Sequence, residues 1–226
     1  MPSSPAQTPR IERSDAAATR ARIVAAAEAL FAERGVEDVS LVEIGKAASQ
    51  RNRSAVQYHF GDKAGLIHAI LDKHTPGIEV RRHALLDAMG PEPELRRAVE
   101  AFVLPIAEKL EDPDGGVAFV RLNAELIGHA SYPLMQLGEE RPNPAADRLA
   151  EVFTRVAAPV PAPLWETRWR LVIGLLFHGL ADGSRIDADA GAALRRIFVS
   201  QVVDLIEAAL SAPASAATRT ALAASS

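Results

Sequence analysis

Apolar side chains recur at helical spacing through most of the 226-residue chain. The first such segment ends at Arg34, where Gly35 supplies a residue suited to a helix end. Its apolar positions share one helical face and are Ile23, Ala27, Leu30 and Phe31. No segment alternates apolar and polar residues with the period of two that predicts a strand. The pattern therefore predicts an all-α fold.

Two short helices are predicted after this first segment. Ser40 is a favourable N-cap for a helix over about 41–48, because Glu43 three residues later completes a capping box. The next helix is expected over about 52–60, before a glycine. Two short helices joined by a tight turn are typical of a helix-turn-helix.

The second of these short helices has few apolar residues. Val56 and Phe60 are four apart and can anchor one face. At 100° per residue, Ser54, Ala55 and Tyr58 are expected to point away from that face. Arg53, Gln57 and His59 are expected on its flanks. The pattern predicts a small helix with a polar outer face.

The remaining chain is predicted to form a connecting helix and a second helical domain. The connecting helix is expected to be kinked or interrupted at Pro76–Gly77. Five amphipathic segments follow the sequence GPEP, at about 94–110, 116–130, 144–157, 163–181 and 188–210. The resulting division is a flexible arm over 1–14, a helix-turn-helix domain over 15–62, a connecting helix over 63–90, a larger helical domain over 91–210 and a disordered tail over 211–226.

Charge is distributed unevenly along this chain of net charge −4. Residues 1–90 carry 12 basic and 11 acidic residues, a net of +1, whereas the remaining 13 basic and 18 acidic residues give −5. Within 46–63 four basic residues stand against one acidic residue. Such a local patch suits a confined phosphate-binding face, although a solvated loop would have the same composition.

Several classes of protein are disfavoured by composition and motifs. The chain has no cysteine, which excludes disulfides and thiolate metal sites. The longest apolar run, 171–180, is shorter than the roughly 18–20 residues that span a bilayer, and we expect a cytoplasmic protein without a membrane anchor. Common catalytic and nucleotide-binding motifs are absent from the sequence, and its histidines lack paired ligand spacing. We therefore predict no enzyme activity, no cofactor and no metal site.

Three sequence motifs stand in order along the first part of the chain, "ALFAERG" over 29–35, "SLVEIGKAA" over 40–48 and "SAVQYHFGDKAGL" over 54–66. Together they resemble the TetR family of bacterial transcription regulators. The resemblance covers about 17–75, and the helical remainder matches in architecture and length. The turn between the two short helices departs from the family pattern, because it is one residue longer and lacks the usual glycine.

The resemblance implies a regulator that binds double-stranded operator DNA through the second short helix. Arginine pairs with phosphate or guanine, and asparagine and glutamine suit adenine edges. The predicted DNA-binding residues are Ser40, Gln50, Arg51, Asn52, Arg53, Ser54, Ala55, Gln57, Tyr58, His59 and Lys63. For His59 packing under the first helix is an alternative, and Tyr58 could instead close the small core.

The resemblance also implies a homodimer that pairs through the last two long helices, over about 163–181 and 188–210. A core role for both helices is the alternative. A small-molecule effector of unknown identity is expected within the middle helices, in a pocket with mainly aliphatic walls. Its candidate contacts, each of which could instead serve the core or the surface, are Arg121, Asn123, His129, Met135, Trp165, Trp169 and His178. A helical interaction or ligand-binding module without DNA binding is the rival function.

Overall fold

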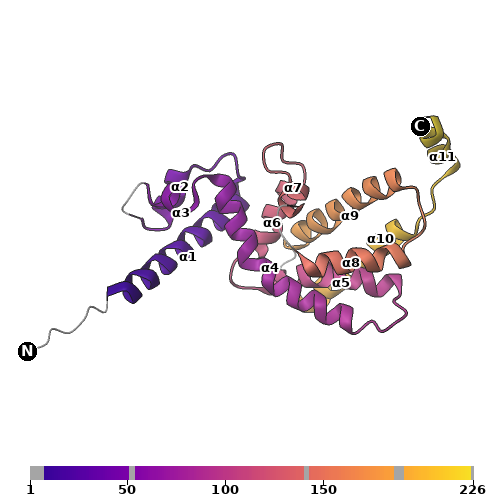
Figure 1. Cartoon of the computed structure of the whole chain (residues 1–226), viewed down its shortest axis with the longest axis horizontal. Coiled ribbons are helices and arrows are strands. Elements are labelled where there is room, and N and C mark those ends of the chain that lie inside the picture. The colour runs from indigo at the N-terminus through magenta and orange to yellow at the C-terminus, as the bar shows by residue number, and fades with distance from the viewer. Residues whose placement is uncertain (1–7, 51–53, 140–142, 186–190, 225–226) are drawn as a thin grey trace, which may run out of the picture.

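The computed structural model describes residues 8–50, 54–139, 143–185 and 191–224, and every regular element in these ranges is a helix. This confirms the predicted all-α fold. Figure 1 shows three helices at one end of the molecule and a larger helical bundle at the other, with α4 running between them. The three helices at one end are α1 (Thr8–Arg34), α2 (Leu41–Ala47) and α3 (Ala55–Phe60). The connecting helix is α4 (Lys63–Asp87).

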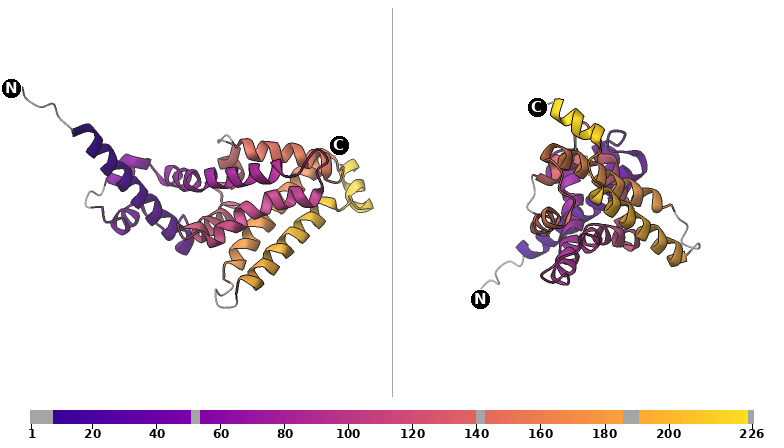
Figure 2. Two further views of the ribbon diagram at one scale, coloured as in Figure 1. Left: turned by 90° about the horizontal axis from the view of Figure 1, so that it is seen from below. Right: turned by 90° about the vertical axis from the view of Figure 1, so that its right-hand side faces the viewer.

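The larger part is built from the helices that follow the connecting helix. They are α5 (Leu95–Ala107), the 3-10 helix η1 (Glu108–Glu111), α6 (Gly116–Leu126), α7 (Leu134–Glu139), α8 (Pro144–Val156), α9 (Ala162–Gly183), α10 (Gly191–Ser211) and α11 (Ala216–Ala224). The two views of Figure 2 show α9 and α10 together on one side of this bundle. Among the described helices, none is by itself long and apolar enough to cross a membrane, although α10 and α11 reach that length and composition as a pair bent by 55°.

The small domain has its own apolar core. Ile23 and Phe31 of α1 are buried together with Ile44 of α2 and Val56 of α3. Gly45 of α2 lies next to Val56 of α3, where an added Cβ atom would meet Val56 Cγ2 at 3.4 Å, an ordinary van der Waals distance. Hydrophobic burial of this kind fixes α3 against α1 and α2 and leaves its other face free.

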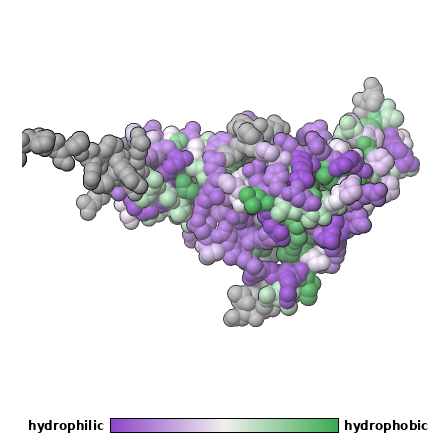
Figure 3. All heavy atoms as spheres, turned by 60° about the horizontal axis from the view of Figure 1, so that its bottom comes forward, coloured by the Kyte–Doolittle hydropathy of each residue, from purple (hydrophilic) through white to green (hydrophobic). Residues whose placement is uncertain are grey.

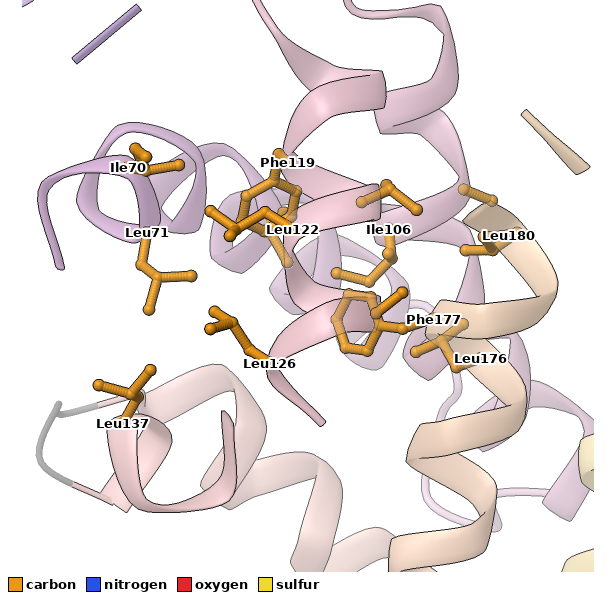
Figure 4. Close-up of a cluster of buried hydrophobic side chains, with 14 of the residues drawn as sticks. Ile70, Leu71, Ile106, Phe119, Leu122, Leu126, Leu137, Leu176, Phe177 and Leu180 are labelled. Atoms are coloured by element: carbon orange, nitrogen blue, oxygen red, sulfur yellow. The ribbon is translucent and has the colours of Figure 1, made fainter. Parts of the chain in front are cut away.

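The core of the larger domain is centred on α6. In Figure 4, Phe119, Leu122 and Leu126 of α6 lie between Ile70 and Leu71 of α4 and a group from α9. The α9 group consists of Leu176, Phe177 and Leu180, all of which are buried. Helix α6 packs against the connecting helix on one side and against α9 on the other. A movement of α6 would therefore change its packing contacts with α4.

Three helical segments were not predicted. Helix α1 begins at Thr8, so the expected arm over 1–14 is helical from residue 8 onward. Helix α7 (Leu134–Glu139) lies between two predicted segments, and α11 lies within the tail over 211–226 that was expected to be disordered. The α11 segment is rich in alanine, which has the highest helix propensity, whereas the prediction used apolar periodicity. In α11, Ser215 Oγ accepts a capping hydrogen bond from the N–H of Thr218 at 3.1 Å.

The connecting helix is not interrupted at Pro76, which rules out one of the two predicted alternatives, an interruption or a kink. Helix α4 runs unbroken from Lys63 to Asp87 with the proline inside it. Pro76 cannot donate a backbone hydrogen bond, yet His74 and Ile78 on either side of it are buried. We attribute the continuity of the helix to this tertiary packing, which outweighs one missing hydrogen bond.

Candidate DNA-binding surface and effector domain

The turn between α2 and α3 is built around a serine in a left-handed conformation. Ser49 has φ 56°, and its N–H donates to the carbonyl of Lys46 at 3.0 Å. The N–H of Gln50 donates to the carbonyl of Gly45 at 2.9 Å. These two bonds form a Schellman ending, which usually places glycine where Ser49 stands. Ser49 thus takes the left-handed position for which a glycine is usual.

The start of α2 is capped as the sequence predicted. Ser40 Oγ accepts from the N–H of Glu43 at 3.2 Å, and Glu43 Oε2 accepts from the N–H of Ser40 at 2.9 Å. Arg34 at the end of α1 donates to Glu43 Oε1 at 2.9 Å. Hydrogen bonds from the Ser40 backbone, the Ser40 hydroxyl and Arg34 lower the pKa of Glu43 to about 2. The ionised carboxylate thus ties the start of α2 to the end of α1.

Helix α3 presents a polar face to solvent. Tyr58 is 84% exposed, and Gln57 and Ser54 are also exposed. Ala55 is buried, which corrects the prediction that its side chain points away from the core. The six-residue α3 lies against both α2 and α4, so a side chain as short as a methyl group is easily covered. Gln50 is half-buried, with Nε2 donating to the carbonyl of Ala48 at 2.9 Å.

The end of α3 is held by an arginine from α1. Arg20 donates from Nη1 to the carbonyl of His59 at 3.1 Å, and its guanidinium lies 4.4 Å from the centre of the Phe60 ring. The His59 ring is half-buried and lies 5.2 Å from the Tyr58 ring, edge to face. Packing and a DNA contact therefore both stay open for His59, whereas the exposure of Tyr58 favours contact.

Lys63 forms bonds within the protein that the sequence analysis did not foresee. Its Nζ donates to the carbonyls of Val36 at 2.7 Å and Glu37 at 3.0 Å. These bonds tie the start of α4 to the α1–α2 connection. A phosphate contact by Lys63 stays a prediction, and it would compete with these two carbonyls for the same ammonium group.

The predicted residues Arg51, Asn52 and Arg53 lie outside the described residues. The described exposed residues closest to them in sequence are Ser49 and Ser54, in the turn between α2 and α3. Lys46 is exposed on α2, and so is Val42, at 48%. The part of the surface that the structure describes thus combines a cation, an amide, a phenol and hydroxyl groups, which are groups that contact DNA backbone and base edges.

The second domain touches the small domain directly through α6. The backbone N–H of Val36, just after α1, donates to Glu125 Oε1 at 2.7 Å. His129 Nε2 lies 3.5 Å from Glu37 Oε1, while its Nδ1 accepts from the N–H groups of Ser131 and Tyr132. His129 was predicted to contact an effector, but it lies at the boundary between the domains.

The other predicted effector contacts divide into two groups. Arg121, Met135 and His178 are exposed, and Arg121 donates to Ser184 Oγ at 3.1 Å. The structure therefore places these three on the surface instead of the interior. Asn123 is buried, with Nδ2 donating to the carbonyl of Phe119 within its own helix at 2.8 Å. That bond satisfies part of its hydrogen-bonding capacity without a ligand.

Trp165 and Trp169 belong to a cluster of four aromatic rings. The Trp169 ring lies 5.1 Å from Phe102, 5.6 Å from Phe153 and 6.4 Å from Trp165, measured between ring centres. The two phenylalanines are buried, and the tryptophans pack against the core from partly exposed positions. The cluster joins α5, α8 and α9, and the sequence analysis did not include its two phenylalanines. Apolar spacing within α5 and α8 places both on buried faces, so they could have been identified.

Charged groups on α4 inside the second domain were also missed. Arg82 is 6% exposed, and its Nε donates to the carbonyl of Ala101 at 3.2 Å. Burial lowers the pKa of Arg82 to about 10, which leaves it charged at neutral pH. Glu79 Oε1 is buried without a hydrogen-bond partner in the described part of the chain. Within the same ranges, no group of three or more histidine, aspartate or glutamate side chains could hold a metal ion.

Helices α9 and α10 expose a row of large apolar side chains. Leu171 on α9 is 70% exposed, and on α10 the exposed fractions are 45% for Leu194, 61% for Ile197 and 54% for Leu205. Figure 3 shows apolar surface gathered over this side of the second domain. Exposed apolar residues that cluster on neighbouring helices mark a surface suited to association with another protein.

The fold and the site together define a two-domain helical protein with an N-terminal helix-turn-helix and a helical C-terminal domain. The model of the bacterial regulatory proteins, tetR family, matches residues 23–70. The model of the tetracyclin repressor-like C-terminal domain matches residues 100–212. The chain belongs to the TetR family.

Individual relatives agree with this assignment. SrpR of Pseudomonas putida, an HTH-type transcriptional regulator, is 31% identical over 178 residues, which are 74% of this chain and 78% of SrpR. TtgR of Pseudomonas putida, another such regulator, is 41% identical over 63 residues, which are 28% of this chain and only 30% of TtgR. A tetR-family protein of Rhodococcus RHA1 has the same fold, with a TM-score of 0.55 and 20% identity over 87% of this chain and 98% of that protein.

Proposed function

We propose that the protein is a homodimeric transcriptional repressor that binds a palindromic operator and releases it when a small-molecule effector binds. The observation that carries this proposal is the helix-turn-helix, whose second helix is anchored by Val56 and exposes Gln57 and Tyr58. An exposed polar helix of this kind fits the major groove of B-DNA. Membership of the TetR family supports the proposal.

The DNA contacts fall into base-reading and backbone-binding groups. Gln57 has the donor and acceptor pair that matches an adenine edge. Tyr58 and Ser54 are exposed on the same helix and can donate to phosphate or bases. On the family resemblance we add Ser40, Gln50 and His59 as backbone or groove contacts, together with the basic turn that contains Arg51, Asn52 and Arg53.

Dimerisation is proposed through the exposed apolar row on α9 and α10. A two-fold dimer uses the same surface of both copies, and the row supplies apolar side chains that a partner can bury. Such a dimer presents two α3 helices to half-sites about one helical turn apart. Because it acts on operator DNA, we place the protein in the cytoplasm.

The effector is proposed to bind beside the aromatic cluster of α5, α8 and α9. Trp165 and Trp169 are the only tryptophans in the sequence, and both belong to this cluster. Their packing with Phe102 and Phe153 suits an apolar or amphipathic ligand. A fluorescence screen of apolar compounds would report binding directly, and the proposed effector must also weaken operator binding by the factor by which operator weakens effector binding.

Selection of binding sites from random DNA tests the proposed function. We expect an enriched palindrome with two half-sites about 10 base pairs apart, bound by a dimer with strong dependence on salt. Failure to enrich any sequence at low salt would favour the rival function, a helical ligand-binding or interaction module without DNA binding. No catalytic role is proposed.

A further inference from the structure

A carboxylate is buried where the DNA-binding domain meets the second domain. Glu28 lies on α1 and is 2% exposed, on the same side of the helix as the core residues Val24 and Phe31. A buried carboxylate is stable only when cations or hydrogen-bond donors surround it. The residues that supply these groups belong to α4 and therefore join two elements of the fold.

Both carboxylate oxygens of Glu28 have a partner on α4. His74 Nε2 lies 2.5 Å from Oε1, and Lys73 Nζ donates to Oε2 at 2.7 Å. His74 is 1% exposed, and its ring lies 4.5 Å from the Phe119 ring of α6. Lys73 also pairs with Asp114 at 2.9 Å, in the connection that leads into α6.

The start of α6 is shaped to fit this carboxylate. Gly115 immediately precedes α6 with φ 81°, and a Cβ atom built there would overlap the Glu28 carboxylate. A glycine is required at this position for both its backbone conformation and its close approach. Glu28, which belongs to α1, thus contacts both α4 and the residue that precedes α6.

The charged groups around this point form two neighbouring sets. In the first set Lys73 pairs with both Glu28 and Asp114, and in the second Lys109 on η1 donates to Asp112 at 2.9 Å. Burial opposes the charge on Lys73, but hydrogen bonds to Glu28 and Asp114 outweigh it and raise the pKa of Lys73. The Lys109 hydrogen bond, with a smaller contribution from His74, lowers the pKa of Asp112. Lys73 therefore stays charged beside the Glu28 carboxylate.

We propose that Glu28 is a positioning residue for DNA binding. Through its contacts with His74, Lys73 and the start of α6, Glu28 fixes the orientation of the DNA-binding domain relative to the effector domain. This inference rests on the proposed function, because the orientation matters only if two α3 helices must match two half-sites. Separating α1 from α4 or α6 would leave a buried charge without its partners, so intermediate orientations are disfavoured. Glu125 of α6 accepts a hydrogen bond from the N–H of Val36, and this bond ties the residues just after α1 to α6.

The test measures the affinity of full-length variants for the operator enriched from random DNA. If Glu28→Gln leaves the binding-competent orientation in about a tenth of the molecules, affinity falls about tenfold. Because Glu28 and His74 are in direct contact, the Glu28→Gln change should cost less in a His74→Asn background than in the native protein. Glu33→Gln is the matched control, because it removes a carboxylate from an exposed position on the same helix and should leave affinity unchanged.

A distance measurement keeps the test independent of affinity. The chain has no cysteine, so Ala21→Cys on the exposed side of α1 gives one spin label per subunit. The distance distribution between the two labels of a dimer should broaden in Glu28→Gln and not in Glu33→Gln. Circular dichroism identifies a variant that fails to fold, and His74→Asn, which removes one partner of Glu28, then replaces Glu28→Gln in the distance measurement, with the same broadening expected.

The outcomes separate this inference from the function on which it rests. If the native protein neither dimerises nor selects a DNA sequence, the proposed function fails. If it does both, and Glu28→Gln binds the operator as tightly as Glu33→Gln with an unchanged distance distribution, the inference alone is overturned.

Discussion

Ser49 occupies a backbone conformation that costs a non-glycine residue about 1 kcal/mol or more. Because the Schellman bonds already define this ending, Ser49→Gly should keep the turn and raise the free energy of unfolding of the small domain by about 1 kcal/mol. Urea unfolding followed by circular dichroism measures the change. Ser54→Gly is the control, since Ser54 has φ −92° and gains nothing from glycine. Equal effects of the two substitutions would contradict the assigned strain.

Glu43 makes the small domain sensitive to acid. Its pKa in the folded protein is about 2, below the ordinary value of 4.5, so its stabilising contribution is complete above 4.5 and is lost as the pH falls towards 2. Glu43→Gln should lower the melting temperature at about pH 7, and the difference from the native protein should shrink in acid. Melting curves between about pH 7 and pH 3 measure this effect. A difference that stays constant over that range would show that Glu43 does not act through its charge.

At the scale of the element, the apolar row on α9 and α10 makes a prediction about assembly. Leu205 is 54% exposed, and burial of a leucine in a dimer contributes about 2 kcal/mol. Leu205→Asp should therefore weaken dimerisation by about 2 kcal/mol or more, as measured by sedimentation equilibrium. Val80→Asp is the control, because Val80 is 72% exposed on α4, outside the row. A Leu205→Asp protein that dimerises like the control would show that the dimer uses another surface.

Most helices could be predicted because their signals are local. The capping box at Ser40 and the spacing of Ile23, Ala27 and Phe31 depend only on residues near one another in sequence. Three helical segments were missed, because α7, α11 and the start of α1 are short or lack the apolar periodicity that the prediction used. The continuity of α4 through Pro76 depends on burial of its neighbours, which the local sequence does not show.

The candidate site was predictable only in part. The exposed side of α3 follows from the positions of Val56 and Phe60, and Tyr58 and Gln57 lie as expected. The bonds of Lys63 to Val36 and of Glu28 to His74 join residues 27 and 46 positions apart, so no local pattern indicates them. Glu28 itself could have been noticed, because helical spacing places it on the buried face of α1.

At the scale of the whole molecule, the two domains are connected at several points. They include the connecting helix α4, the bond between Glu125 and Val36, and the buried contact of Glu28 with His74. In Figure 4, α6 lies between α4 and α9, so a ligand beside α9 can bias α4 and α1 through a single packed element. This arrangement suits a protein in which an effector changes the spacing of two recognition helices.

The central claim is that α3 reads DNA sequence, and one binding measurement tests it most directly. The affinities of the native protein and of a Gln57→Ala, Tyr58→Ala double variant are compared on the selected operator and on an unrelated duplex, over a range of salt concentrations. The account predicts that the double variant loses about 1–3 kcal/mol on the operator and little on the unrelated duplex, so that its selectivity relaxes. A folded double variant that keeps the native affinity and selectivity would contradict it.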